Sequence, residues 1–186
     1  MGYWNTRGLR GKFLEELINM ANSMYRKKGV ALIQKIPTPI TPLEIEKGTG
    51  RIKKAYFESK STVDYIGVIQ GIPVCFDAKE TNTKSLPFKN IHEHQFEFME
   101  DFEKQDGISF FIVYFKLYDK FYILPFKILK KYWEEGKNGK NKSIKYELFD
   151  KSLEIKSNNG YILDYIDTLK RFIECYDEYD VFGDFA

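Results

Sequence analysis

Two acidic residues and a lysine lie in a stretch whose pattern would bring them together in space. Residues 62–81 read Thr-Val-Asp-Tyr-Ile-Gly-Val-Ile-Gln-Gly-Ile-Pro-Val-Cys-Phe-Asp-Ala-Lys-Glu-Thr. Two β-rich arms flank Gln70-Gly71, and a two-residue turn of this kind predicts an antiparallel hairpin. We expect Ile69 to pair with Ile72, which sets the register of the other pairs.

This register places Asp64 opposite Asp77, and Thr62 opposite Lys79. Side chains alternate along a strand, so Asp77 and Lys79 share one face with Cys75. Facing carboxylates repel each other unless a positive charge lies between them. The hairpin therefore predicts a divalent-metal site with a catalytic cation beside it.

The tripeptide acid-x-Lys is common by itself, and it also occurs at 58–60, 135–137 and 154–156. At 77–79 it lies in an alternating strand with a second acid in register. That context makes this copy specific.

The composition is that of an ordinary globular protein: of 186 residues, 43% are hydrophobic and 30% are charged. This length can bury one sizeable core, so we expect a single domain over 1–186. A net charge of +2 does not imply a nucleic-acid partner. The eight lysines from Lys120 to Lys145 could follow phosphates, but a solvated lysine-rich face is the simpler interpretation.

Two cysteines, Cys75 and Cys175, lie far apart without metal-ligand spacing, and the chain shows no signal peptide. Structural thiols in a reduced, cytoplasmic compartment fit best. The longest apolar run, 110–115, is too short to span a bilayer, so no membrane partner is expected.

Apolar residues at helical spacing predict an amphipathic helix over 12–28. Glu15 lies at the border of its apolar stripe, where the simplest interpretation is a solvated helix flank. Residues 30–36 read as a strand, and the three prolines of 37–42 predict an extended segment outside regular pairing. The next stretch, 43–57, carries basic residues around two glycines and predicts a protruding basic hairpin or loop.

A further helix is predicted over 91–104, with Gln95 on the same inward line as Ile91, Phe98 and Phe102. A buried glutamine needs hydrogen-bond partners, so it either supports the core or reaches the metal site. The remaining expected elements are a central buried strand over 108–117, its hairpin partner over 121–124, a short helix from Pro125 to about 135, a flexible basic loop over 136–145 and a final helix over 162–176.

Several short motifs follow one another along the chain. They are Arg10-Gly11 before a helix with Glu15, Lys35-Ile-Pro-Thr-Pro39, Lys54-Ala-Tyr-Phe57, Ser61-Thr-Val-Asp64-Tyr, Asp77-Ala-Lys-Glu-Thr81 and His92-Glu-His-Gln95. In their types and order these motifs resemble those of the RecU family of Holliday junction resolvases, and the resemblance extends from about residue 8 to 170. The resemblance implies an α/β fold, a restriction-endonuclease-like mixed β-sheet flanked by helices, with a PD-(D/E)XK site and a protruding basic stalk at about 43–55.

The resemblance also implies roles for particular residues. Metal ligands would be Thr62, Asp64, Asp77 and Gln95. Lys79 would stabilise the transition state, and Glu15 would match an acid on the first helix that supports the site. Mg²⁺ is the expected ion, with Mn²⁺ as a substitute. DNA contacts would be made by Arg7, Arg10, Lys47, Arg51, Lys53 and Lys54.

This chain departs from the family pattern in two ways. The pattern carries Glu where this chain has Asp77, which shortens the reach by one methylene. Glu44 and Glu46 interrupt the basic residues of the stalk, and the basic N-terminal extension is nearly absent.

The activity implied is symmetric, Mg²⁺-dependent nicking of four-way DNA junctions in recombination and repair. A homodimer would do this in the cytoplasm at the nucleoid, with recombinase and branch-migration proteins as candidate partners. One alternative is a metal-dependent nuclease of the same fold that acts on linear or damaged duplex. Another is a non-catalytic junction-binding modulator of recombination, which magnesium-dependent nicking would exclude.

Overall fold

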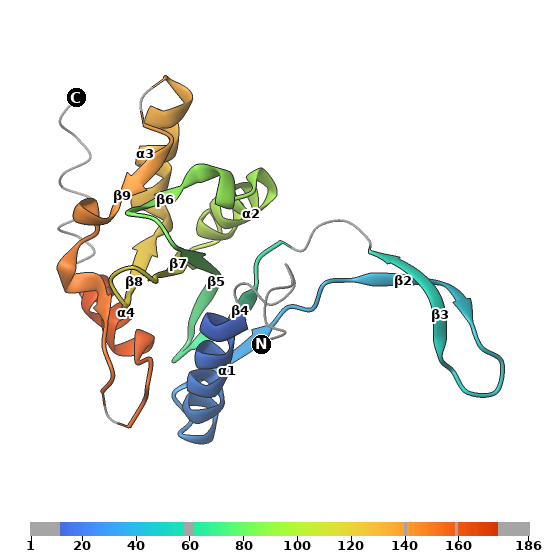
Figure 1. The fold of residues 1–186 in the computed structure, drawn as a ribbon. Helices are drawn as coiled ribbons and strands as arrows, with labels where there is room; N and C mark the ends of the chain where they lie inside the picture. The colour runs from blue at the N-terminus through green and yellow to red at the C-terminus, as the bar shows by residue number, and fades with distance from the viewer. Residues whose placement is uncertain (1–11, 58–61, 140, 159, 175–186) are drawn as a thin grey trace, which may run out of the picture.

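A six-stranded mixed sheet forms the centre of the computed structural model, which describes residues 12–57, 62–139, 141–158 and 160–174 (Figure 1). Its strands lie in the order β1 (Ala31–Lys35), β4 (Tyr65–Ile69), β5 (Ile72–Thr81), β7 (Ile108–Phe115), β8 (Lys120–Pro125) and β10 (Glu154–Ile155). Neighbouring strands are antiparallel except β5 and β7, which run parallel. A parallel pair needs a crossover, and helix α2 (Glu93–Glu103) provides it.

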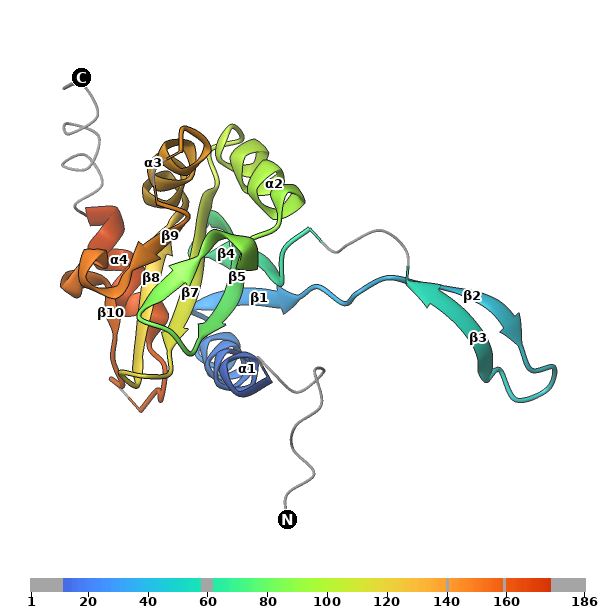
Figure 2. The same ribbon diagram turned by 45° about the horizontal axis from the view of Figure 1, so that its top comes forward.

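Helices cover both faces of this sheet, as Figures 1 and 2 show. α1 (Lys12–Lys27) and α4 (Tyr165–Glu174) pack on the face that carries Phe76 and Ile112. α2 and α3 (Phe126–Lys137) pack on the opposite face, which carries Cys75 and Phe111. The continuous apolar run of β7 follows from this arrangement, because a strand covered on both faces has no solvent side.

Most of the expected elements are confirmed. The helix predicted over 12–28 is α1, the strand over 30–36 is β1, and the central strand and its hairpin partner are β7 and β8. Pro125 precedes α3 as its N-cap residue, in agreement with the predicted start.

Two helices differ in detail from their predictions. In α2 the fully inward residues are Phe96 and Met99, while Phe98 and Phe102 are only partly buried. The cause is that α2 packs against both β7 and α3, so its buried stripe is turned from the predicted line. α4 begins at Tyr165, and the side chain of Ile162, predicted to start this helix, is 60% exposed.

The segment predicted as a flexible loop over 136–145 is partly ordered. Its end forms β9 (Ser143–Lys145), which pairs antiparallel with β6 (Ser85–Pro87). Ile144 supplies the reason, because its side chain is buried in the core beside α2 and α3. Short 3-10 turns complete the chain at η2 (Phe88–Asn90), η3 (Tyr146–Leu148) and η4 (Lys151–Leu153).

A separate hairpin, β2 (Ile40–Ile45) and β3 (Ile52–Phe57), extends away from the sheet and its helices (Figures 1 and 2). The prediction that the prolines of 37–42 stay outside regular pairing is wrong at its end, since Pro42 lies in β2 opposite Ala55. A two-stranded ribbon has only edge strands, and the register shifts directly after Pro42, so a residue without an N–H is accommodated.

No described helix is long and apolar enough to cross a membrane.

Candidate active site

The β4–β5 hairpin has the predicted register. Ile69 pairs with Ile72, and the ladder continues to the pair of Tyr65 and Phe76. Gln70 and Gly71 have φ angles of 47° and 93°, so both turn residues adopt the left-handed conformation that such a two-residue turn requires.

Asp64 lies just beyond the last rung of this ladder. Its Oδ2 accepts a hydrogen bond from the backbone N–H of Ala78 at 3.0 Å, while its carbonyl oxygen accepts one from Ile36 at 2.8 Å. Beyond the pair of Tyr65 and Phe76, the Asp64 carboxylate therefore accepts the hydrogen bond of a β5 backbone N–H that a strand carbonyl would otherwise accept. This bond places Asp64 beside Asp77, as the register predicted, but the ladder stops before it can pair Thr62 with Lys79.

Asp77 is fully buried on the face of β5 that α2 covers. Its Oδ1 accepts a hydrogen bond from Nε2 of Gln95 at 2.7 Å, and its Oδ2 lies 2.5 Å from the ammonium of Lys79. The same ammonium donates to Oε1 of Gln95 at 3.0 Å and lies 5.9 Å from the centre of the Phe111 ring. Three side chains from β5 and α2 thus form one closed polar network in an apolar layer.

The start of α2 holds Gln95 in place. The backbone N–H of His92, the N-cap residue, donates to Oε1 of Gln95 at 3.2 Å, an arrangement that resembles a capping box. The amide oxygen therefore accepts from a backbone group and from Lys79, which leaves the amide nitrogen to donate to Asp77. The inward position that the sequence predicted for Gln95 is confirmed.

Burial dominates the electrostatics of the site. It raises the pKa of Asp77 to about 7; the Lys79 ammonium acts against this rise and the Asp64 carboxylate adds to it. The pKa of Tyr65 is raised as well, mainly by burial and further by the negative charges of Glu15, Asp64 and Asp77.

The donor set fits a hard divalent cation. Oδ2 of Asp77 is buried and, within the described chain, accepts no hydrogen bond of good geometry, although Lys79 lies close to it. The carboxylates of Asp64 and Asp77 are therefore the oxygen ligands at hand, whereas the amide oxygen of Gln95 already accepts from His92 and Lys79. No group of three or more His, Cys, Asp or Glu side chains suited to a metal occurs among the described residues.

Glu15 pairs with Lys35, which lies next to Ile36, the residue bonded to the carbonyl of Asp64. Thr62 is half-buried three residues before β4. Arg7 and Arg10 lie outside the described residues. The basic residues of the β2–β3 hairpin are exposed there, namely Lys47, Arg51, Lys53 and Lys54.

Sequence reasoning missed one carboxylate near the site. Glu80 follows Lys79 but points to the other face of β5, where its Oε1 accepts from the backbone N–H of Leu14 at 3.0 Å and its Oε2 pairs with Lys116. Glu80 thereby ties the first turn of α1 to the strand that carries Asp77. The alternation along 77–80 was the available signal.

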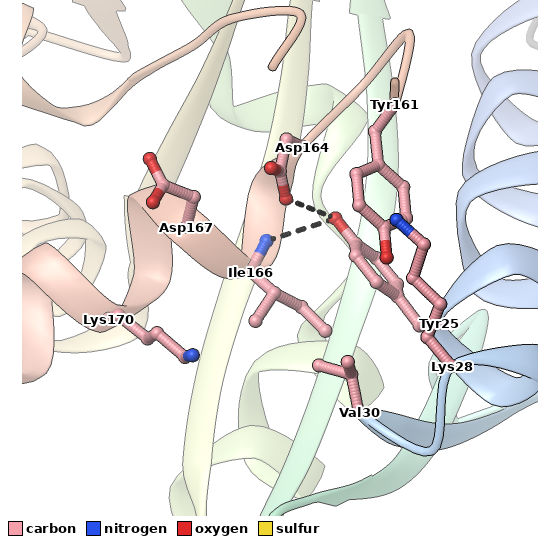
Figure 3. Close-up of a pocket in the computed structure, with 8 residues that line it drawn as sticks. All are labelled: Tyr25, Lys28, Val30, Tyr161, Asp164, Ile166, Asp167 and Lys170. Atoms are coloured by element: carbon pink, nitrogen blue, oxygen red, sulfur yellow. Dashed lines mark hydrogen bonds between the residues drawn. The ribbon is translucent and has the colours of Figure 1, made fainter. Parts of the chain in front are cut away.

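A second polar cluster lies in a cavity of about 500 Å³ on the opposite face of the sheet, where α1 and α4 pack (Figure 3). Tyr25 donates to Oδ1 of Asp164 at 2.8 Å and accepts from the backbone N–H of Ile166 at 3.3 Å. Lys28 lies 4.3 Å from the centre of the Tyr161 ring. These contacts join α1 to α4, and the hydroxyl of Tyr25 has a structural role because both of its hydrogen bonds are to the α4 segment.

A comparison with protein families identifies the chain. The profile of the family described as "Recombination protein U", RecU, matches residues 9–171. The chain belongs to the RecU family of Holliday junction resolvases. It is therefore an endonuclease of DNA recombination and repair.

Individual RecU relatives agree with this assignment. A "Holliday junction resolvase RecU" of Pediococcus pentosaceus is 42% identical over 162 residues, covering 85% of this chain and 77% of the relative. Its counterpart in Oenococcus oeni is 39% identical over 170 residues, covering 88% and 86%. That of Staphylococcus epidermidis is 41% identical over 162 residues, covering 85% and 74%.

Among solved structures, the Hjc Holliday junction resolvase of Archaeoglobus fulgidus matches with a TM-score of 0.40 and 8% identity, covering 63% of this chain and 74% of that one.

Proposed function

We propose that this chain resolves four-way DNA junctions by metal-dependent hydrolysis at the site formed by Asp64, Asp77, Lys79 and Gln95. The observation that carries this proposal is the buried Asp77. Its Oδ1 is held by Gln95, while its Oδ2 lies beside Lys79 without a well-directed hydrogen bond. Burying a carboxylate in this way lowers stability, and such buried, perturbed carboxylates occur preferentially at functional sites.

Asp64 and Asp77 would hold a Mg²⁺ ion, with the oxygen of Thr62 as a further ligand; the amide oxygen of Gln95 would join them only on releasing Lys79. Mn²⁺ would substitute. When bound, the ion supplies Lewis-acid polarisation of the scissile phosphate and lowers the pKa of a bound water. A divalent charge also favours the ionised form of Asp77, against the burial that raises its pKa.

Lys79 acts on the phosphate itself. Its ammonium is held between Asp77 and Gln95, so it is oriented before the substrate arrives. A fixed positive charge there offsets the negative charge that develops on the phosphate as water attacks. Glu15, through its pair with Lys35, would support the segment that carries Asp64.

The β2–β3 hairpin would be the stalk of this restriction-endonuclease-like fold and would enter the centre of the junction. Its exposed basic side chains suit phosphate contacts, which position DNA without reading its sequence. Apolar side chains of the hairpin are exposed as well, including Leu43, Ile45 and Phe57, and the last is 73% exposed.

Cutting two opposing strands needs two such sites, so we expect a homodimer whose axis coincides with that of the junction. The place of action would be the bacterial nucleoid in the cytoplasm, together with recombinase and branch-migration proteins.

The test is cleavage of an end-labelled four-way junction and of a linear duplex of equal length, each with and without Mg²⁺. The expected result is a pair of symmetric, magnesium-dependent nicks near the crossover, with the duplex left intact. Equal cutting of both substrates would instead assign a general duplex nuclease, and binding without nicking in Mg²⁺ or Mn²⁺ would contradict catalysis.

A further inference from the structure

A hollow of about 510 Å³ lies between η2 and the end of α3, on the same face of the sheet as Asp77. Its apolar walls include Phe88 and Trp133, and three lysines, Lys89, Lys137 and Lys142, surround them. All three lysines are exposed. The described residues that line this hollow include no acid.

The aromatic walls are rigidly packed and connect to the candidate active site. The ring of Trp133 stacks on Phe96 with centroids 5.2 Å apart and lies 5.4 Å from the ring of Phe88. Phe96 directly follows Gln95, the residue that binds Asp77. A Cβ at Gly136 would come within 2.8 Å of the Phe88 ring, so a glycine there lets α3 approach this wall closely.

Trp133 has a further property that a purely structural side chain seldom shows. Its indole N–H is buried and, within the described chain, has no hydrogen-bond acceptor. Such a group costs about 1–3 kcal/mol relative to a bonded one. A ligand in the hollow could recover part of this cost only by displacing the side chains that now cover this N–H.

The charge of this hollow differs from that of the cavity in Figure 3. There Lys28 and Lys170 are accompanied by Asp164 and Asp167, so lysine charge is balanced within the cavity. In the hollow beside Trp133, no acid among the described lining residues offsets the charge of the lysines. Aromatic walls surrounded by lysines are the combination that accepts bases of single-stranded DNA by stacking and their phosphates by charge.

We propose that this hollow binds an unpaired nucleotide of a junction strand, with its base against Phe88 and Trp133 and its flanking phosphates on Lys89, Lys137 and Lys142. This inference rests on the proposed function and adds a second DNA contact to it. A fully paired duplex keeps its bases stacked inside, so the hollow would favour strands that open near a crossover.

Trp133 itself reports on this proposal. The sequence has two tryptophans, Trp4 and Trp133, so a Trp4→Phe variant leaves Trp133 as the sole emitter. Its fluorescence is measured in EDTA during titration with an eight-nucleotide thymidine oligomer, a four-way junction, and a duplex with closed hairpin ends. We expect the oligomer and the junction to quench the emission, and the duplex to leave it nearly unchanged.

The lysines are tested in the same background with the double variant Lys137→Ala/Lys142→Ala. Loss of two phosphate contacts should lower the slope of log affinity for the oligomer against log salt by about 1.4. The matched control is Lys156→Ala/Lys170→Ala, which removes two exposed lysines that line other cavities. We expect this control to keep the wild-type slope.

Unchanged Trp133 emission with the oligomer and the junction, or the same slope in both double variants, would overturn the proposal. Quenching by a polyglutamate peptide and not by DNA would also overturn it, since the hollow would then take an acidic protein partner. Junction cleavage by the wild-type chain in Mg²⁺ is scored separately. If cleavage is observed and Trp133 stays silent, only this inference fails; if cleavage is absent, the proposed function fails whatever Trp133 shows.

Discussion

At the scale of single residues, Gln95 has the clearest predicted effect. Replacing Gln95 with Ala leaves Oδ1 of Asp77 buried without its donor at 2.7 Å. An unsatisfied buried carboxylate oxygen should lower the free energy of unfolding by about 1–3 kcal/mol and slow junction cleavage as well. Urea unfolding and a cleavage assay measure the two effects, with the exposed Gln105→Ala as the control. Unfolding unchanged from wild type would contradict the role given to Gln95.

Glu103, the last residue of α2, makes stability depend on pH. Burial raises its pKa to about 7, with the nearby charges of Lys127 and Lys130 acting in the opposite direction. Its unfolded value is about 4.3, so the folded chain binds the proton more tightly, and stability falls as pH rises from about 4.3 to about 7. Glu103→Gln should abolish this fall, so its stability advantage over wild type should grow between pH 5 and pH 8. The two pKa values alone would give about 2–3 kcal/mol, but solvent screens this partly exposed carboxyl, so we expect about 1 kcal/mol. Urea unfolding at both pH values tests this, with the exposed Glu97→Gln as the control; a constant difference would contradict it.

At the scale of elements, the β2–β3 hairpin separates DNA binding from folding. Lys53 and Lys54 are exposed on β3 and far from the core. Lys53→Glu/Lys54→Glu should therefore weaken junction binding in EDTA at least about tenfold, with no change in Tm. Fluorescence anisotropy and thermal unfolding provide the readouts, and Lys156→Glu/Lys170→Glu is the matched control. Equal loss of affinity in both double variants would show a general charge effect and not a role of the hairpin.

Some strand pairings could be predicted from the sequence and others could not. The register of β4 and β5 was predictable, because Gln70-Gly71 defines both the turn and the pairing. The pairing of β9 with β6 was not, because three residues surrounded by lysines give no strand signal, and Ile144 is recognisable as core only once α2 and α3 are in place. Pro42 was misjudged because the rule against proline in strands applies to interior strands, and β2 is an edge.

At the scale of the whole molecule, the order of the sheet depends on contacts between distant segments. The parallel pairing of β5 with β7 brings Asp77 beside Phe111, and no local pattern predicts that neighbour. For the site, the register predicted that Asp64 lies beside Asp77, but the predicted pair of Thr62 and Lys79 is not formed, and helical spacing placed Gln95 inward without deciding its partner. It could not predict that Gln95 bridges Asp77 and Lys79, which needs the packing of α2 on the sheet.

The most direct test of the central claim is the Asp77→Asn variant. Asparagine keeps the shape of Asp77 and can still accept from Gln95, but its NH₂ group then faces the ammonium of Lys79, so the variant should fold with reduced stability. We predict at least about a thousandfold loss of Mg²⁺-dependent junction cleavage, while junction binding in EDTA stays within about threefold of wild type. The exposed Asp101→Asn serves as the control. A folded Asp77→Asn chain that cuts junctions at the wild-type rate would contradict the account.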